Sequence, residues 1–298
     1  MNDYVTIVEV GPRDGLQNEK QNLSAPLKIE LIERLANCGI PVVEAGSFVN
    51  PKWVPQMADT QAVLTGLTRL PGTRYPVLVP NLTGYERAIA AGATEIAVFT
   101  AASESFSQRN TNCSINESMT RLEPVVALAK SAGIRVRAYV SCVLGCPYEG
   151  EIEADAVTAV CARLMKMGCA EISLGDTIGV ATPAVANALV RTVSSVVPIG
   201  QLAVHFHDTY GQALANILAC LDAGVRIVDS AIAGLGGCPY ANGASGNVAS
   251  EDVVYMLHGL GLETGIDLAR LASTGAWISN QLQRPNSSRA GLALSQSK

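Results

Sequence analysis

The sequence has few charged and few aromatic residues, and it lacks any long apolar run. Charged residues make up 16% of the 298 positions and aromatic residues 5%, against 48% hydrophobic residues. Because no stretch approaches the roughly 18–20 consecutive apolar residues that span a bilayer, we expect no membrane segment. The net charge of −5 and the lack of a basic stripe with interleaved aromatics argue against a nucleic-acid-binding surface. These features predict a well-packed soluble protein.

Signals of secretion or of organelle targeting are also lacking. Met1 to Tyr4 lead directly into the first predicted strand, so we expect no leader sequence. The cysteines form no CxxC pair, which argues against a zinc ribbon and against a disulfide framework. A cytoplasmic protein with reduced thiols is therefore expected. The eight cysteines lie at positions 38, 113, 142, 146, 161, 169, 220 and 238.

A repeated joint between a helix and a strand determines the predicted fold. At each joint an amphipathic segment rich in Ala and Leu ends near a glycine, and a short apolar run of β-forming residues follows. A glycine just past a helix end adopts the left-handed conformation that closes the helix. The joints lie at Gly39, Gly72, Gly92, Gly133, Gly168, Gly200 and Gly224.

Together with an opening strand over Thr6–Gly11, these joints give eight strands that alternate with helices. Apolar strands separated by helices predict a parallel α/β sheet covered on both faces. Eight βα units in about 260 residues is the repeat number of a (β/α)8 TIM barrel. A doubly wound open sheet remains the alternative, because periodicity does not show closure. We expect one domain over residues 1–298: a barrel over about 5–260 and additional C-terminal helices over about 261–298, with a frayed polar end from Ser287 to Lys298.

Two of the three histidines lie close together in the stretch LAVHFHD, from Leu202 to Asp208. If this stretch is a strand, His205 and His207 point to the same face, about 6–7 Å apart along the chain. That spacing suits two imidazoles on one metal ion. A pair of strand histidines held by hydrogen bonds is the alternative.

Polar residues gather just after the predicted strands. In a TIM barrel the active site lies at the C-terminal ends of the strands, so the shared placement predicts one active-site rim. Single members also have plain structural explanations: Asp176 could cap a helix, and Glu44 could pair with an arginine. In chain order the rim residues are Arg13, Asp14, Gln17, Glu44, Ser47, Tyr139, Ser141, Asp176, Thr177, His205, His207, Cys238 and Asn247.

A divalent cation is the expected centre of this rim. His205 and His207 offer two nitrogens, Asp14 a carboxylate and Asn247 a carbonyl oxygen. Mixed nitrogen and oxygen ligands suit Mn²⁺, Mg²⁺ or non-haem Fe²⁺, whereas a structural Zn²⁺ more often recruits thiolates. The adjacent Arg13 stays charged and could stabilise a developing oxyanion.

The loop GLGGCPYANGASGN follows the last strand. Cys238, with glycines on both sides, is a candidate acid or base on a mobile lid, and an inert loop thiol is the alternative. The glycines do not spell GxGxxG, so no dinucleotide site is expected.

These stretches resemble the 3-hydroxy-3-methylglutaryl-CoA lyase family over about Val5 to Leu260. The specific motifs are VEVGPRDGLQNE, SFVNPKWVPQMAD, YVSCVLGCPYEG, EISLGDTIGVATP, HDTYGQALAN and AGLGGCPYANGASGN. The Arg-Asp pair and the HxH are shared by a wider group of metal-dependent TIM-barrel enzymes, whereas the loop with Cys238 is a sharper sign of the lyase. The residue between the histidines is Phe206, where some family members carry Cys, and it should point away from the metal.

The resemblance implies a cleavage of 3-hydroxy-3-methylglutaryl-CoA to acetoacetate and acetyl-CoA, as in leucine breakdown, by a homodimer. Mg²⁺ or Mn²⁺ would be bound, Arg13 would hold the thioester carbonyl and stabilise the enolate, and Cys238 would take part in proton transfer. The implied ligands are Asp14, His205, His207 and Asn247, with His205 also a candidate for proton transfer; Glu44 and Asp176 match further catalytic residues, and Gln17, Ser47, Tyr139 and Thr177 are expected to bind substrate.

Three other interpretations compete with this one. A lyase for longer-branched 3-hydroxy-3-methyl acyl-CoAs would share the chemistry and differ in the acyl pocket. An acetyl-CoA condensing enzyme of the same wider group would usually carry a further C-terminal region. A barrel without catalytic activity would be expected to have lost the rim residues, yet all of them are present.

Overall fold

The computed structural model describes residues 3–237 and 246–295. Its strands are all parallel and form one sheet in the order β2-β1-β9-β8-β7-β6-β5-β4-β3. The strands within the described residues are β1 (Thr6–Glu9), β2 (Val42–Val43), β3 (Gly46–Ser47), β4 (Val77–Leu78), β5 (Glu95–Ala101), β6 (Arg135–Ser141), β7 (Glu171–Asp176), β8 (Leu202–Phe206) and β9 (Ile227–Ser230).

The sheet closes through the segment that contains β2 and β3. Along this segment the amides bond alternately to the two neighbouring strand segments: Glu44 N–H donates to Glu9 O at 2.9 Å, and Ala45 N–H donates to Pro76 O at 2.8 Å. This alternation is the pattern of one inner strand of a parallel sheet. β2 and β3 are therefore two parts of one barrel strand, and the predicted eight-stranded barrel is confirmed over the open-sheet alternative.

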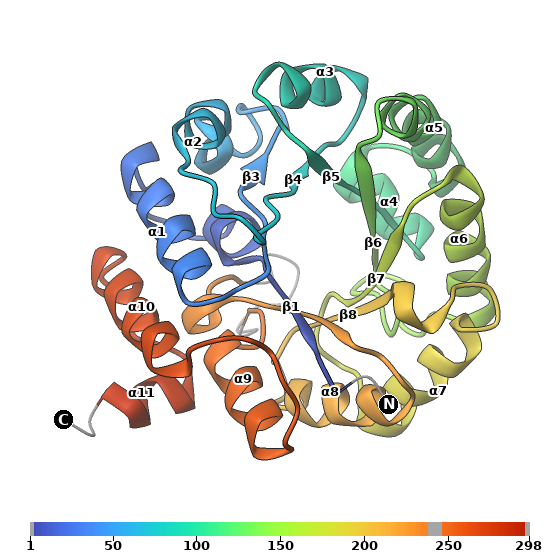
Figure 1. Cartoon of the computed structure of the whole chain (residues 1–298). Coiled ribbons are helices and arrows are strands. Elements are labelled where there is room, and N and C mark those ends of the chain that lie inside the picture. Colours follow the sequence, from blue (N-terminus) through green and yellow to red (C-terminus); the bar gives the residue numbers. More distant parts are fainter. Residues whose placement is uncertain (1–2, 238–245, 296–298) are drawn as a thin grey trace.

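Helices surround the barrel (Figure 1). They are α1 (Ala25–Asn37), α2 (Thr60–Gly66), α3 (Leu82–Ala90), α4 (Glu104–Thr111), α5 (Ile115–Ser131), α6 (Ala154–Met167), α7 (Pro183–Val193), α8 (Ala213–Asp222), α9 (Ser250–Gly259), α10 (Leu268–Gln281) and α11 (Arg289–Ser295). Among the helices in the described part of the chain, none is both long enough and apolar enough to cross a membrane.

The glycine closes the helix as predicted at five of the seven joints. Gly39, Gly92, Gly133, Gly168 and Gly224 have positive φ and lie within two residues of a helix end, whereas Gly72 has positive φ in a turn six residues beyond α2, and Gly200 does not have positive φ. Gly200 lies in a 3-10 turn, η3 (Ile199–Gln201), seven residues beyond the end of α7 (Pro183–Val193). The Pro198 carbonyl accepts from Gln201 N–H there, so the turn needs no left-handed residue.

The C-terminal helices are confirmed, but the prediction of a frayed end was wrong for the described residues. α11 packs against α9 and α10 (Figure 1). Asp252 fixes its start, because the Asp252 carboxylate accepts from Ser288 Oγ–H at 2.7 Å and from Ala290 N–H at 2.7 Å. The Asp252 carboxylate, distant in sequence, thus orders a segment whose polar composition alone predicts disorder.

Strand alternation divides buried side chains between two environments. On β6, Val136, Ala138 and Val140 belong to the apolar core, whereas Arg137 and Tyr139 hydrogen-bond to each other on the opposite, inward face. The main core lies between the strands and the surrounding helices. The barrel interior also holds buried polar and charged side chains, such as Arg137 and Tyr139, and these lead toward the site.

Candidate metal centre and active site

A cavity of about 600 Å³ opens at the C-terminal ends of the strands. This is the rim where the sequence places the active site. The predicted residues that line the cavity are Arg13, Asp14, Gln17, Tyr139, Ser141, Thr177, His205 and His207.

His205 and His207 point to the same face of the chain, as predicted. Their ring centroids lie 5.3 Å apart, and both side chains are buried. Phe206, between them, belongs to the apolar core. Alternation along β8 therefore turns both imidazoles toward the cavity and Phe206 away from it.

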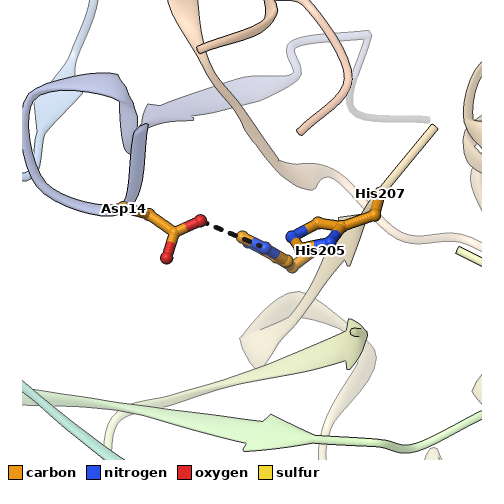
Figure 2. A group of neighbouring side chains, drawn as sticks. All are labelled: Asp14, His205 and His207. Atoms are coloured by element: carbon orange, nitrogen blue, oxygen red, sulfur yellow. Dashed lines mark ion pairs between the residues drawn. The ribbon is translucent and has the colours of Figure 1, made fainter. Parts of the chain in front are cut away.

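Asp14 approaches the two histidines from the other end of the chain (Figure 2). Asp14, His205 and His207 each offer a ligand atom, and these three atoms all lie within 4.8 Å of one another. Asp14 Oδ2 lies 3.9 Å from His205 Nε2. One carboxylate and two imidazoles at this separation fit a divalent cation.

The electrostatics favour the ligating forms of these groups. Burial alone would raise the pKa of Asp14, but Arg13, His205 and His207 lower it to about 2. Burial, followed by the nearby His205, lowers the pKa of His207 to about 4. At neutral pH Asp14 is therefore an anion and His207 a neutral imidazole, which are the states that bind metal ions.

Asn247 lies next to this cluster. Its Nδ2 donates to Asp14 Oδ2 at 2.8 Å and to Leu235 O at 3.1 Å. These bonds hold the Asp14 carboxylate from the side of the last loop. Direct ligation through Asn247 Oδ1 stays a prediction.

Arg13 is buried beside the cluster and held on three sides. Its Nε donates to Glu44 Oε2 at 2.7 Å and its Nη1 to Asp14 Oδ1 at 2.7 Å. Its guanidinium carbon lies 5.2 Å from the centroid of the Tyr139 ring. Although burial opposes charge, Glu44 and Asp14 raise the pKa of Arg13, so it stays a cation. Within the described residues no hydrogen bond occupies Nη2, which leaves a donor for a substrate oxygen.

A π-helical turn, η1 (Gly11–Gly15), positions Arg13 and Asp14. The predicted first strand extended to Gly11, but β1 ends at Glu9, and the Val10 carbonyl then accepts from the amides of Arg13, Asp14 and Gly15. Such turns are frequent at functional sites. Glu9 Oε1 accepts from Gly11 N–H at 2.8 Å and from Ile232 N–H at 2.9 Å, which ties this turn to the last loop.

Asp176 and Ser47 lie at the rim but do not line the cavity. The Asp176 carboxylate accepts from the amides of Val180 at 3.2 Å and Ala181 at 2.9 Å. On β7 it shares a face with Ile172 and Leu174, which belong to the apolar core, so alternation turns it away from the barrel interior. Ser47 Oγ donates to Leu78 O at 3.4 Å. Both contacts hold loops in place, and catalytic or substrate-binding roles for these residues stay predictions.

The other predicted substrate-binding residues have defined contacts. Gln17 Nε2 lies 3.4 Å from Asp14 Oδ1. The Tyr139 hydroxyl donates to Glu44 Oε2 at 3.1 Å. Thr177 Oγ1 accepts from Cys142 N–H at 2.8 Å. All three therefore support the walls of the cavity that they line.

Cys238 lies outside the described residues. The two ends of its loop approach each other at Gly236 and Gly246. A Cβ at Gly246 would lie 2.3 Å from the Gly236 carbonyl carbon, so only glycine permits this approach. Gly236 and Gly246 thus allow the two ends of the loop to meet beside Asn247.

Sequence reasoning missed two buried charged residues below the cavity. Asp229 Oδ2 lies 3.2 Å from His205 Nδ1, and Arg137 forms an ion pair with Asp229. Although burial opposes ionisation, Arg137 and the hydrogen bond from His205 lower the pKa of Asp229. The sequence did carry a signal for them: Arg137 lies within the apolar run RVRAYV and Asp229 within RIVDS. A charged residue within a buried strand needs a partner.

Comparison with known proteins gives a consistent result. The HMGL-like family model matches residues 4–278. The mitochondrial hydroxymethylglutaryl-CoA lyase of Gallus gallus is 58% identical over 289 residues, covering 97% of both proteins. The cytoplasmic 3-hydroxy-3-methylglutaryl-CoA lyase of Danio rerio is 58% identical over 290 residues, covering 97% of this chain and 87% of the relative. The crystal structure of hydroxymethylglutaryl-CoA lyase from Pseudomonas aeruginosa superposes with a TM-score of 0.98 at 53% identity over 100% of both chains. The chain belongs to the HMGL-like family.

Proposed function

We propose that this protein cleaves 3-hydroxy-3-methylglutaryl-CoA to acetoacetate and acetyl-CoA with the help of a divalent cation. The observation that carries the proposal is the buried Arg13 beside the Asp14–His205–His207 cluster, all on one cavity. The shared name of the relatives, at 58% identity over nearly the whole chain, supports this substrate.

The reaction makes three chemical demands. The tertiary hydroxyl must lose its proton, the new ketone must be polarised, and the thioester enolate must be stabilised as the carbon–carbon bond breaks. A bound cation, held by Asp14, His205 and His207 with Asn247 beside them, supplies Lewis-acid polarisation of substrate oxygens. Mg²⁺ and Mn²⁺ are the ions that we propose.

Arg13 meets the third demand. Its Nη2 has no hydrogen bond to the described residues, while Glu44 and Asp14 hold the other side of the guanidinium. A donor that is fixed before the reaction stabilises developing negative charge without reorganising. We assign Arg13 Nη2 to the thioester oxygen.

Proton transfer is assigned to His205 and Cys238. His205 Nδ1 lies 3.2 Å from the Asp229 carboxylate, a contact that favours the tautomer with the proton on Nδ1 and the lone pair on Nε2. Nε2 is therefore the atom that binds a cation or accepts a proton. Cys238 lies on the last loop and is proposed to deliver the proton to the acetyl-CoA carbon.

The walls of the cavity are proposed to bind the acyl part of the substrate. Gln17, Tyr139 and Thr177 contribute polar groups, and Leu78 and Phe99 contribute apolar surface. A volume of about 600 Å³ lies within the usual range for sites that bury a small organic ligand. Glu44 is proposed to hold Arg13, and Asp176 and Ser47 to hold the rim loops.

The test is release of acetoacetate from 3-hydroxy-3-methylglutaryl-CoA by purified protein after chelation and again after Mg²⁺ or Mn²⁺ is restored. We expect turnover to vanish with the chelator and to return with the metal. Metal binding without cleavage would overturn the substrate assignment in favour of a longer-branched acyl-CoA or of condensation with acetyl-CoA.

Assembly, compartment and pathway are proposals that rest on the resemblance. We propose a homodimer, which light scattering of the purified protein tests. We propose a cytoplasmic enzyme of leucine breakdown, although relatives named mitochondrial and cytoplasmic are equally similar to this chain. Growth of a deletion strain on leucine tests the pathway.

A further inference from the structure

A buried carboxylate contacts His205 from inside the barrel. Asp229 is paired directly with His205 in the register of β8 and β9, and its Oδ2 lies 3.2 Å from His205 Nδ1. Asp229 is 1% exposed. The contact lies on the opposite side of the imidazole from Nε2, the nitrogen that lies 3.9 Å from Asp14.

Other residues hold the Asp229 carboxylate in place. Arg137 binds both of its oxygens, with Nη1 at 3.1 Å from Oδ2 and Nη2 on Oδ1. Ser173 Oγ–H donates to Oδ2 at 2.8 Å. A carboxylate in this two-point contact cannot rotate freely, and as an acceptor it requires a proton on the facing nitrogen.

The same guanidinium also connects to the Arg13 side of the site. Arg137 Nη1 donates to the Tyr139 hydroxyl at 2.8 Å, and that hydroxyl donates to Glu44 Oε2 at 3.1 Å. Glu44 in turn accepts from Arg13. One continuous hydrogen-bonded chain therefore links His205 to Arg13 through the barrel interior.

We infer that Asp229 is a positioning residue that fixes the ring orientation and the tautomer of His205, with Arg137 as its anchor. The proton on Nδ1 leaves the Nε2 lone pair free for the cation. This inference rests on the proposed cation site. It goes further because it assigns part of the affinity for the cation to Asp229, which is not among the proposed ligands. Carboxylates behind metal-binding histidines commonly have this effect.

The decisive variant is Asp229→Asn. The two oxygens of Asp229 become one oxygen and one amide nitrogen, so Arg137, which binds both oxygens, loses one acceptor and the two-point contact is broken. The neutral amide also attracts the proton of Nδ1 less than the carboxylate does, so the tautomer with its proton on Nε2, which blocks the cation, gains population. We expect the affinity for Mn²⁺, measured without substrate, to fall about 10- to 100-fold.

Ser107→Ala is the matched control. Ser107, on α4, is buried and its Oγ–H donates to Cys113 O at 2.8 Å, so the variant also removes one buried hydrogen bond but leaves the Asp229 contacts intact. It should leave the Mn²⁺ affinity close to that of the wild type. Equal affinities in wild type and Asp229→Asn would overturn the inference, and so would equal losses in the two variants, because a general loosening of the interior would then be the cause.

A second measurement needs no variant and no metal. The chain has three histidines, so nitrogen NMR of the metal-free wild type, recorded at about pH 8 or above, can report which ring nitrogen of each carries the proton. We expect His205 to carry its proton on Nδ1. A proton on Nε2 would overturn the inference even if Asp229→Asn fails to fold. Failure of the wild type to bind Mn²⁺ would instead contradict the proposed function, and the tautomer would still decide the role of Asp229.

Discussion

Arg13 and Glu44 form a buried ion pair, with Arg13 Nε 2.7 Å from Glu44 Oε2. The pair joins the turn after β1 to the strand that closes the barrel, so one contact links the fold to the proposed oxyanion donor. Arg13 has a second carboxylate partner in Asp14, at 2.7 Å from Nη1.

Removing Glu44 should therefore affect both stability and catalysis. In Glu44→Ala, Arg13 loses the carboxylate at its Nε and keeps Asp14 at its Nη1, and breaking a buried ion pair costs up to about 3–5 kcal/mol. We expect a loss of that size in urea unfolding, together with a lower kcat. Glu30→Ala is the control, because Glu30 pairs with Arg34 on the exposed surface of α1 and should cost no more than about 0.5 kcal/mol. Similar losses in both variants would contradict the role given to the buried pair.

Replacement of Arg13 tests its role in the transition state. In Arg13→Gln we expect kcat to fall about 100-fold or more with little change in KM, because the charge is needed when the enolate forms. Arg109→Gln removes another guanidinium that lines the cavity and stacks on Tyr148 at 4.2 Å from its ring centroid. It should leave kcat near the wild-type value. A change of KM alone in Arg13→Gln would make Arg13 a binding residue only.

Replacement of Asp14 should remove metal binding and activity together. Asp14→Asn keeps the shape of the side chain and removes its charge, so the Mn²⁺ affinity should fall by more than about 100-fold, beyond the usual cost of losing an outer partner. Titration calorimetry measures this directly. Asp208→Asn is the control, since Asp208 accepts from Ala213 N–H at the start of α8 and lies outside the cluster. A fully active Asp14→Asn would remove Asp14 from the ligand set.

The cation should also stabilise the folded protein. Mn²⁺ at 100 times its dissociation constant should raise the free energy of unfolding by about 2.7 kcal/mol if the unfolded chain does not bind it. The measurement is urea unfolding with the metal and again after chelation. The same addition should have almost no effect on Asp14→Asn, and an equal gain in that variant would locate the binding elsewhere.

Two buried carboxyls predict a dependence of stability on pH. Burial raises the pKa of Glu9 to about 7 and that of Glu251 to about 8, from an ordinary value of 4.5. Between pH 4.5 and the raised pKa of each carboxyl, the folded state holds more protons than the unfolded state. The contribution of each group to stability therefore falls as pH rises, up to about pH 7 for Glu9 and about pH 8 for Glu251. Urea unfolding across this interval should show the decline.

Glu251→Gln tests how much Glu251 contributes to the pH dependence of stability. A neutral amide cannot ionise, so the decline between pH 6 and 8 should be shallower in the variant. Glu33→Gln, which changes an acid that bonds to Thr68 N–H at an exposed site, should leave the slope unchanged. An identical slope in wild type and Glu251→Gln would show that Glu251 is ionised in the folded state.

The sequence by itself determined the barrel and most of its rim. Helix ends at glycines and apolar strands are local signals, so the βα repeat could be predicted without knowledge of contacts. The common face of His205 and His207 also followed from strand alternation alone. The same alternation, applied to Ile172, Leu174 and Asp176, would have indicated that Asp176 faces away from the barrel interior.

Only the tertiary structure decided which distant residues meet. Asn247 reaches Asp14, and Asp229 reaches His205, through the closure of the barrel and the register of its strands. Asp252 orders the polar end of the chain in the same long-range way. No local pattern encodes these pairs, because each depends on how separate segments pack. The repeat could therefore be predicted from the sequence, whereas the partners that hold the site required the structure.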